Sequence, residues 1–70
     1  MVQAKYPNIS AERVRRGLSK DDLAQAMGVS RKTIHNWENE GRIPAAAVSK
    51  LAGFFGVSAD YLLGRRKEHP

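Results

Sequence analysis

Apolar residues recur at helical spacing along this chain, and glycine or proline interrupts the pattern at intervals. The clearest stretch carries Val48, Leu51, Ala52 and Phe55, which have the spacing of one buried stripe on a helix, with Phe54 beside it. No segment has the sustained alternation of a half-buried strand or the two-residue turn of a hairpin. We therefore expect helices and no strands.

Five short segments lie between these interruptions, and each opens with a residue that favours the start of a helix. The expected helices are residues 9–16 capped by Asn8, 20–27 capped by Ser19 in a capping box with Asp22, 31–39 capped by Ser30, 44–55 opened by Pro44, and a short last helix from Ser58 through Leu63. A glycine follows each one. The predicted fold is all-α, a compact bundle of five short helices, with residues 1–7 as an N-terminal arm, 8–64 as one domain and 65–70 as a basic, disordered tail.

The joint between the second and third predicted helices has the residue types that a tight turn between two crossing helices requires. Ala24 is small where the helices touch, Gly28 has no Cβ at the turn, and Val29 is an apolar plug for the corner. Ile34 and Trp37 fall on the inward side of the following helix, so we assign Trp37 to the core. These features predict a helix-turn-helix.

The opposite face of the third predicted helix is polar and basic and carries no acid. At about 100° per residue it presents Lys32, His35, Asn36 and Asn39, while Arg31 projects from the first turn. Asparagine can bond adenine at two atoms and Arg or Lys can bond guanine, and the start of a helix attracts phosphate. Any solvated helix face can carry such residues singly, and an ordinary surface role stays open for His35. Together with the constrained turn, the face indicates contact with double-stranded DNA.

Composition excludes several other classes of function. Seventy residues allow one small domain, and they include no cysteine and two histidines that lie far apart in sequence, so we expect no metal site and no cofactor. No nucleophile, base and orienting partner cluster in the sequence, so we expect no catalytic residues and no enzymatic activity. The sequence predicts a binding protein.

Charge and hydropathy narrow the choice of partner. Twelve Lys and Arg against seven Asp and Glu give a formal charge of +5, which favours a polyanion, although many small basic proteins bind no nucleic acid. The first residues lack the apolar stretch of a signal peptide, and no apolar run is long enough to cross a bilayer. We expect a cytoplasmic protein without a membrane partner.

With these positions in place, the chain resembles the lambda-repressor-like helix-turn-helix family, which includes the phage Cro and repressor domains. The resemblance runs from residue 9 to 64. It rests on Arg13, Gly17-Leu18-Ser19, Leu23-Ala24, Gly28-Val29-Ser30, Ile34, Trp37-Glu38, Ile43-Pro44, Leu51-Ala52, Phe55-Gly56-Val57-Ser58 and Asp60-Tyr61-Leu62-Leu63-Gly64. It implies a five-helix bundle in which residues 20–27 cross the DNA backbone and 31–39 read the major groove.

The resemblance also implies a division of roles among the polar residues. Base contacts are expected from Arg31, Lys32, His35 and Asn36, and DNA-backbone contacts from Ser19, Lys20, Ser30, Thr33, Asn39 and Arg42. Members of the family commonly carry glutamine in place of Lys20, where it reaches a phosphate and braces the third helix. Lysine cannot accept a hydrogen bond, so that form of brace is missing here. The family ion pair corresponds to Arg13 and Glu38.

From this resemblance we expect a sequence-specific transcriptional regulator of the phage or bacterial type, a repressor that binds a palindromic operator as a homodimer. Candidates for the dimer contact lie off the main apolar stripe or in the short last helix, although some of them could simply cover the core: Phe54, Ala59, Tyr61 and Leu63. An antitoxin with a toxin partner, a restriction controller protein, and an interaction module that has lost DNA binding remain alternatives. A co-purifying second small protein would distinguish the antitoxin.

Overall fold

The computed structural model describes residues 5–65, and this part of the chain contains helices and no strand. The elements are α1 (Pro7–Arg15), α2 (Lys20–Met27), α3 (Arg31–His35), a π-helical turn η1 (Asn36–Glu40) that continues α3, α4 (Ala45–Phe55) and α5 (Ala59–Leu62). The predicted all-α bundle of five short helices is therefore confirmed. None of the helices in the described range is both long and apolar enough to span a membrane.

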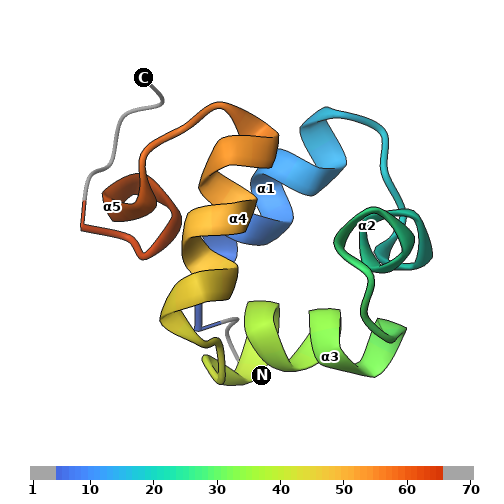
Figure 1. Ribbon diagram of the computed structural model, residues 1–70. Coiled ribbons are helices and arrows are strands. Elements are labelled where there is room, and N and C mark those ends of the chain that lie inside the picture. The colour runs from blue at the N-terminus through green and yellow to red at the C-terminus, as the bar shows by residue number, and fades with distance from the viewer. Residues whose placement is uncertain (1–4, 66–70) are drawn as a thin grey trace.

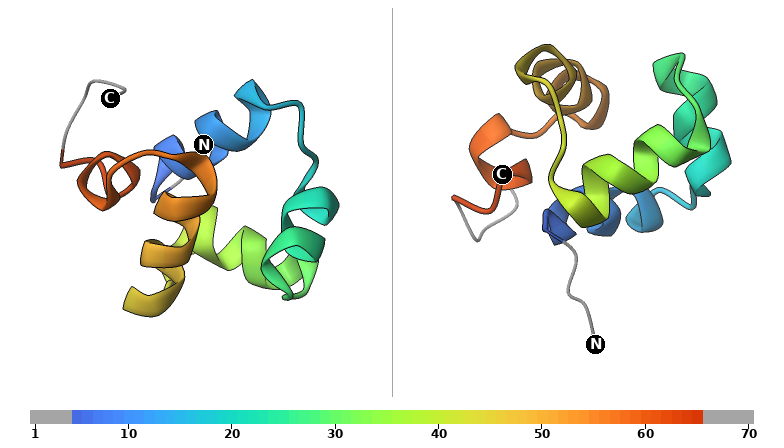
Figure 2. Two further views of the ribbon diagram at one scale, coloured as in Figure 1. Left: turned by 45° about the horizontal axis from the view of Figure 1, so that its top comes forward. Right: turned by 90° about the horizontal axis from the view of Figure 1, so that it is seen from below.

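α4 packs against α5, α1 packs against both α5 and η1, and α2 packs against α3 (Figure 1). α2 and α5 lie on opposite sides of the bundle in both Figure 1 and the left view of Figure 2. α3 crosses one end of the bundle and meets α2 steeply at a short turn. One side of α3 is thus left facing away from the other helices.

The core draws one or more side chains from every helix. Its members are Ile9, Leu23, Ala24, Met27, Ile34, Trp37, Leu51, Phe55, Val57, Tyr61 and Leu62. The predicted stripe on α4 is buried at Val48, Leu51 and Phe55, and Trp37 is 5% exposed, as its inward phase predicts. Burying one large aliphatic or aromatic side chain contributes roughly 1.5 to 3 kcal/mol, so this cluster is the main stabilising feature of a small domain.

Serine caps begin three of the helices. At α2 the Asp22 N–H donates to Ser19 Oγ (3.0 Å) and the Ser19 N–H donates to Asp22 Oδ2 (2.9 Å), which is the predicted capping box. The hydrogen bonds from Ser19, the backbone one foremost, lower the pKa of Asp22 below its usual value near 3.8. Ser30 and Ser58 cap α3 and α5 in the predicted positions.

The predicted cap of the first helix is wrong. α1 begins at Pro7, and no side chain caps it. Proline at the first helical position has its φ preset and lacks an N–H to satisfy, so the start needs less from a cap. Asn8 lies inside the helix instead, and its Nδ2 donates to the Tyr61 carbonyl (2.6 Å), which links α1 to α5.

The third helix also ends differently from the prediction. After His35 the backbone widens into η1, and the helical segment continues through Glu40 instead of stopping at Asn39. Gly41 ends it with a φ of +73°, a conformation that glycine adopts without steric cost. The Asn36 carbonyl accepts the N–H of the terminal glycine, which closes the wide turn.

Both ends of the described range are tied to the bundle. The Lys5 N–H donates to the Asn39 carbonyl (3.2 Å), so part of the expected N-terminal arm lies along η1. At the other end the Arg65 N–H donates to the Asp60 carbonyl (2.8 Å). The rest of the expected arm and tail, residues 1–4 and 66–70, lies outside the described residues.

Candidate nucleic-acid interface

The turn between α2 and α3 fixes the direction in which α3 leaves α2. Gly28 has a φ of +72°, and the Val29 N–H returns to the Ala24 carbonyl (2.9 Å). Val29 then packs against the core, as the sequence predicts. From α4, the Lys50 Nζ donates to the Met27 carbonyl (3.3 Å), which satisfies an open carbonyl at the end of α2. The turn is therefore held from both sides.

The four residues expected to contact bases all project from α3 or the first residue of η1. Arg31, Lys32 and His35 are exposed and Asn36 is half-buried, whereas Ile34 between them is fully buried. The inward and outward faces of the helix thus follow the predicted phase. This arrangement presents cations, an imidazole and an amide on one continuous surface.

Two acids from neighbouring segments approach this surface, which the acid-free sequence of the helix face does not predict. Asp21 Oδ1 on α2 lies 4.0 Å from Arg31 Nε, and Glu40 Oε1 lies 3.1 Å from Arg42. All four side chains are exposed, and exposed ion pairs contribute only about 0 to 1 kcal/mol. Phosphate groups can therefore displace them at low cost.

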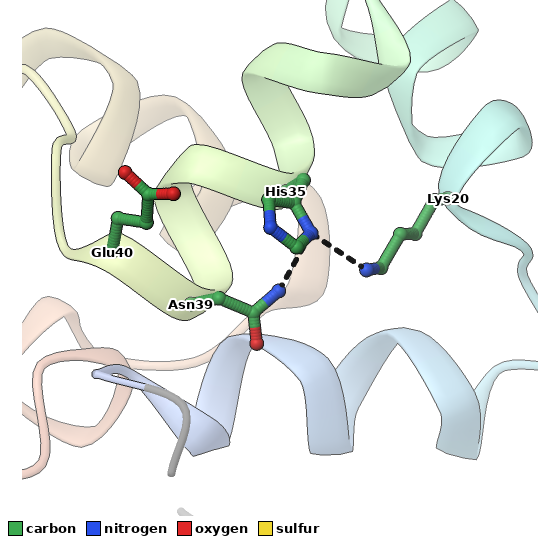
Figure 3. Close-up of a pocket in the computed structure, with 4 residues that line it drawn as sticks. All are labelled: Lys20, His35, Asn39 and Glu40. Atoms are coloured by element: carbon green, nitrogen blue, oxygen red, sulfur yellow. Dashed lines mark hydrogen bonds between the residues drawn. The ribbon is translucent and has the colours of Figure 1, made fainter. Parts of the chain in front are cut away.

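Lys20, His35 and Asn39 meet beside an open pocket of about 460 Å³, which Glu40 also lines (Figure 3). Lys20 Nζ lies 3.3 Å from His35 Nδ1, and Asn39 Nδ2 lies 3.0 Å from the same nitrogen. Lysine takes the place of the family glutamine and makes a different, exposed contact with α3, at His35, the last residue of that helix. Sequence analysis did not foresee this contact, since the two residues are 15 positions apart.

The remaining residues expected to touch the DNA backbone flank α3. Ser19 begins α2, while Ser30 and Thr33 lie at the start of α3 with their hydroxyl oxygens 2.9 Å apart. Arg42 follows η1 and is 76% exposed. Each serine oxygen accepts a backbone N–H in its cap, and either hydroxyl can be the donor in the contact between Ser30 and Thr33.

Arg13 and Glu38 are brought together by the fold. Arg13 Nε donates to Glu38 Oε2 (2.8 Å), and the same guanidinium donates to the Leu18 carbonyl (2.8 Å). The arginine side chain is 12% exposed and the carboxylate 1%. One guanidinium therefore connects α1, η1 and the loop before α2, and it holds the far end of the α3–η1 segment in place.

A second buried acid, Glu12, was missed. It is fully buried on α1 and forms an ion pair with Arg16, which also donates to the Phe55 carbonyl and lies 4.9 Å over that ring. Burial, followed by a hydrogen bond with Glu12, raises the pKa of Tyr61. The sequence contains a signal for this pair, because Glu12 lies one turn after the apolar Ile9 and four residues before Arg16, a spacing at which helical side chains are neighbours.

The residues expected in a dimer contact divide into two groups. Phe54 is 47% exposed, and Ala59 and Leu63 are half-buried. Tyr61 is 4% exposed and belongs to the core, so its assignment to a surface contact is wrong. Its ring fills space between α5 and the core, and its hydroxyl is directed toward Glu12.

Comparison with known proteins gives two matches. The family described as helix-turn-helix matches residues 9–62. The repressor protein CI of Enterobacteria phage phi80 is 37% identical over 49 residues, which cover 70% of this chain and 21% of that repressor. The chain therefore spans about a fifth of the length of this curated relative. No solved structure matches.

Proposed function

This chain belongs to the lambda-repressor-like helix-turn-helix family, and on that premise we propose that it is a transcriptional regulator that binds double-stranded DNA in a sequence-specific manner. The observation that carries the proposal is the outward face of α3. A buried Ile34 and a constrained turn fix the helix, and Arg31, Lys32 and Asn36 are directed away from the core. An α-helix fits the major groove, where these side-chain types distinguish guanine and adenine.

The proposed mechanism separates reading from attachment. Arg31, Lys32 and Asn36 contact base edges, while Lys20 and Arg42 contact phosphates on either side of α3. We place the protein in the cytoplasm, where it acts as a repressor. Repression follows because a domain that occupies an operator excludes polymerase from that stretch of DNA. The name of the phage relative, a repressor, supports this direction of control.

The proposed assembly is a homodimer on a palindromic operator. One domain of this size covers a single half-site, and two-fold dimers place their recognition helices about 34 Å apart, one helical turn of DNA. Phe54, which lies near the end of α4 with nearly half of its surface exposed, supports a contact at that end of the helix. Light scattering of the complex and the dyad symmetry of selected sites test this point.

The test begins with selection of bound duplexes from a random pool and continues with alanine variants. Asn36→Ala and Lys32→Ala should weaken binding to the selected duplex by roughly 1 to 3 kcal/mol and binding to a scrambled duplex much less. Lys20→Ala and Arg42→Ala should weaken both duplexes alike and make the salt dependence shallower by about one unit per lost phosphate contact. Arg31 is measured with them, because its first-turn position also allows a phosphate contact.

Arg65→Ala is the matched control. It removes one exposed positive charge that pairs with Asp60 on α5, and α5 lies on the opposite side of the bundle from α2 (Figure 1). Binding to either duplex should therefore change little beyond a small general effect of charge. If the Asn36 and Lys32 variants lose affinity equally for both duplexes, α3 is not the reading helix and the proposal is wrong.

A further inference from the structure

The cluster of Lys20, His35 and Asn39 carries a second conclusion, which rests on the proposed function. We propose that these three side chains form one phosphodiester-binding site, and that His35 takes up a proton when the DNA backbone occupies the site. DNA binding would then depend on pH through a single residue.

Two donors converge on the Nδ1 nitrogen of His35. A lysine ammonium has donors and no acceptor, so the contact with His35 Nδ1 requires a lone pair on that nitrogen. The Asn39 amide donates to the same atom, and both donors reach it from one side of the ring (Figure 3). In this arrangement Nδ1 acts as the acceptor, which corresponds to the tautomer that carries its hydrogen on Nε2.

The other charged groups at this position are few. Within residues 5–65, the pocket beside His35 is lined by one cation, Lys20 from α2, and one acid, Glu40 from η1. Arg42 lies 3.1 Å from the carboxylate of Glu40 and offsets its charge. Lys5 adds a further basic side chain at the end of η1, where its N–H donates to Asn39. The surroundings of His35 in the free protein are therefore not strongly acidic.

Occupation by a phosphodiester reverses this balance. Phosphate oxygens are charged acceptors and bind N–H donors more strongly than a neutral ring nitrogen does. Lys20 and Asn39 therefore redirect their donors from His35 to the phosphate, which leaves Nδ1 with an open lone pair beside an anion. Both changes favour the imidazolium, so Nδ1 binds a proton from the buffer and becomes a third donor to the same phosphate.

The sign of the pH dependence follows from this linkage. When the bound state holds one more proton than the free state, affinity decreases as pH rises, with a limit of about tenfold per pH unit for one proton. Histidine changes its charge between about pH 5 and 8, so the effect should fall in that window. Because the contact is to a phosphate, a short duplex of any fixed sequence serves as the probe.

The experiment measures the dissociation constant of such a duplex from about pH 5 to 8 for the wild type, His35→Gln and His69→Gln. Glutamine keeps an oxygen that can accept from Lys20 and Asn39 but binds no proton. Wild type and His69→Gln should lose affinity as pH rises, by roughly three- to tenfold per unit at the steepest point, and His35→Gln should be nearly flat. Calorimetry in two buffers of different ionisation enthalpy should show proton uptake only where His35 is present.

The outcomes separate the two proposals. A chain that binds no duplex at any pH overturns the proposed function and this inference together. If the dissociation constant of the duplex does not change with pH, only the inference is overturned. The same holds if His35→Gln shows the same pH dependence as the wild type. Should His35→Gln fail to fold by circular dichroism, His35→Asn takes its place, because its amide oxygen also accepts a hydrogen bond and binds no proton. An unchanged pH dependence in that variant overturns the inference, and loss of the pH dependence supports it.

Discussion

Replacement of Arg13 by alanine tests whether the buried ion pair stabilises the domain. The substitution removes both hydrogen bonds to Glu38 and the one to the Leu18 carbonyl, and a weaker contact with Ser10 Oγ at 3.4 Å. The helix itself should tolerate the change, because alanine has the highest helix propensity. The cost therefore comes from the groups that lose their partner.

The magnitude follows from the burial of those groups. Glu38 is 1% exposed, so without Arg13 it is a buried carboxylate that lacks its ion pair, and breaking a buried pair costs about 3 to 5 kcal/mol. Arg13 is itself 12% exposed, which lets some water reach the vacated space, so we expect the lower end, about 3 kcal/mol. A domain of this size has a total stability of roughly 4 to 10 kcal/mol. The variant should therefore lose roughly 30 to 75% of its stability.

Urea and thermal unfolding followed by circular dichroism provide the measurement. A loss of about 3 kcal/mol corresponds to a decrease in Tm of roughly 12 to 24 °C in a domain of this length. Arg42→Ala is the matched control, because its ion pair with Glu40 has a similar distance but is exposed, and it should cost less than about 1 kcal/mol. A double-mutant cycle of Arg13→Ala with Glu38→Gln should show strong coupling. Equal losses in the Arg13 and Arg42 variants, or a cycle without coupling, would refute the reasoning.

Three further predictions concern the turn, a cap and the core. Gly28→Ala should destabilise the domain by about 1 to 2 kcal/mol, because alanine is strained at a left-handed φ even where the space is open. Gly53→Ala should stabilise it by about 0.5 to 1 kcal/mol, because this glycine lies inside α4 in open space and has no positive φ. The urea midpoints of the two variants should shift in opposite directions, and a shift in the same direction would contradict this reasoning. Because the pKa of Asp22 is lowered in the folded protein, its stabilising effect is present above the usual value near 3.8 and is lost as pH falls through the folded-state value. In Asp22→Asn the free energy of unfolding should therefore decrease less over this acidic range than in the wild type. The same decrease in both proteins would contradict the prediction. Because the pKa of Tyr61 is raised in the folded protein, its contribution to stability is complete below about pH 10 and decreases as pH rises further. In Tyr61→Phe the free energy of unfolding should therefore decrease less at alkaline pH than in the wild type. The same decrease in both proteins would show that the buried hydroxyl is not the cause.

Sequence analysis predicted those parts of the structure that depend on neighbouring residues. The capping box of Ser19, the serine caps of α3 and α5, and the glycine turn at Gly28 are decided within a few positions of the chain. The inward phase of Ile34 and Trp37 follows from helical periodicity alone. Local rules therefore gave the order of the helices and the orientation of the candidate interface.

Contacts between distant residues were less accessible to the same rules. Asn8 bonds across the bundle to α5 instead of capping its own helix, and no local pattern distinguishes these two uses of an asparagine. The bond between Lys20 and His35 depends on the steep crossing of α2 and α3, which places a side chain from one helix beside another helix. The assignment of Tyr61 to the surface failed because the short last helix packs more deeply than its length suggested.

The candidate interface depends on these distant contacts more than on the helix that carries it. α3 has five residues and η1 five more, and an isolated helix of that length is unstable in water. Its direction is set by contacts on two sides: the burial of Ile34 in the core and the salt bridge of Glu38 to Arg13. Stability and the geometry of the interface are therefore coupled, so a substitution that removes one of these contacts should disturb the outward face even when the residue lies far from any DNA.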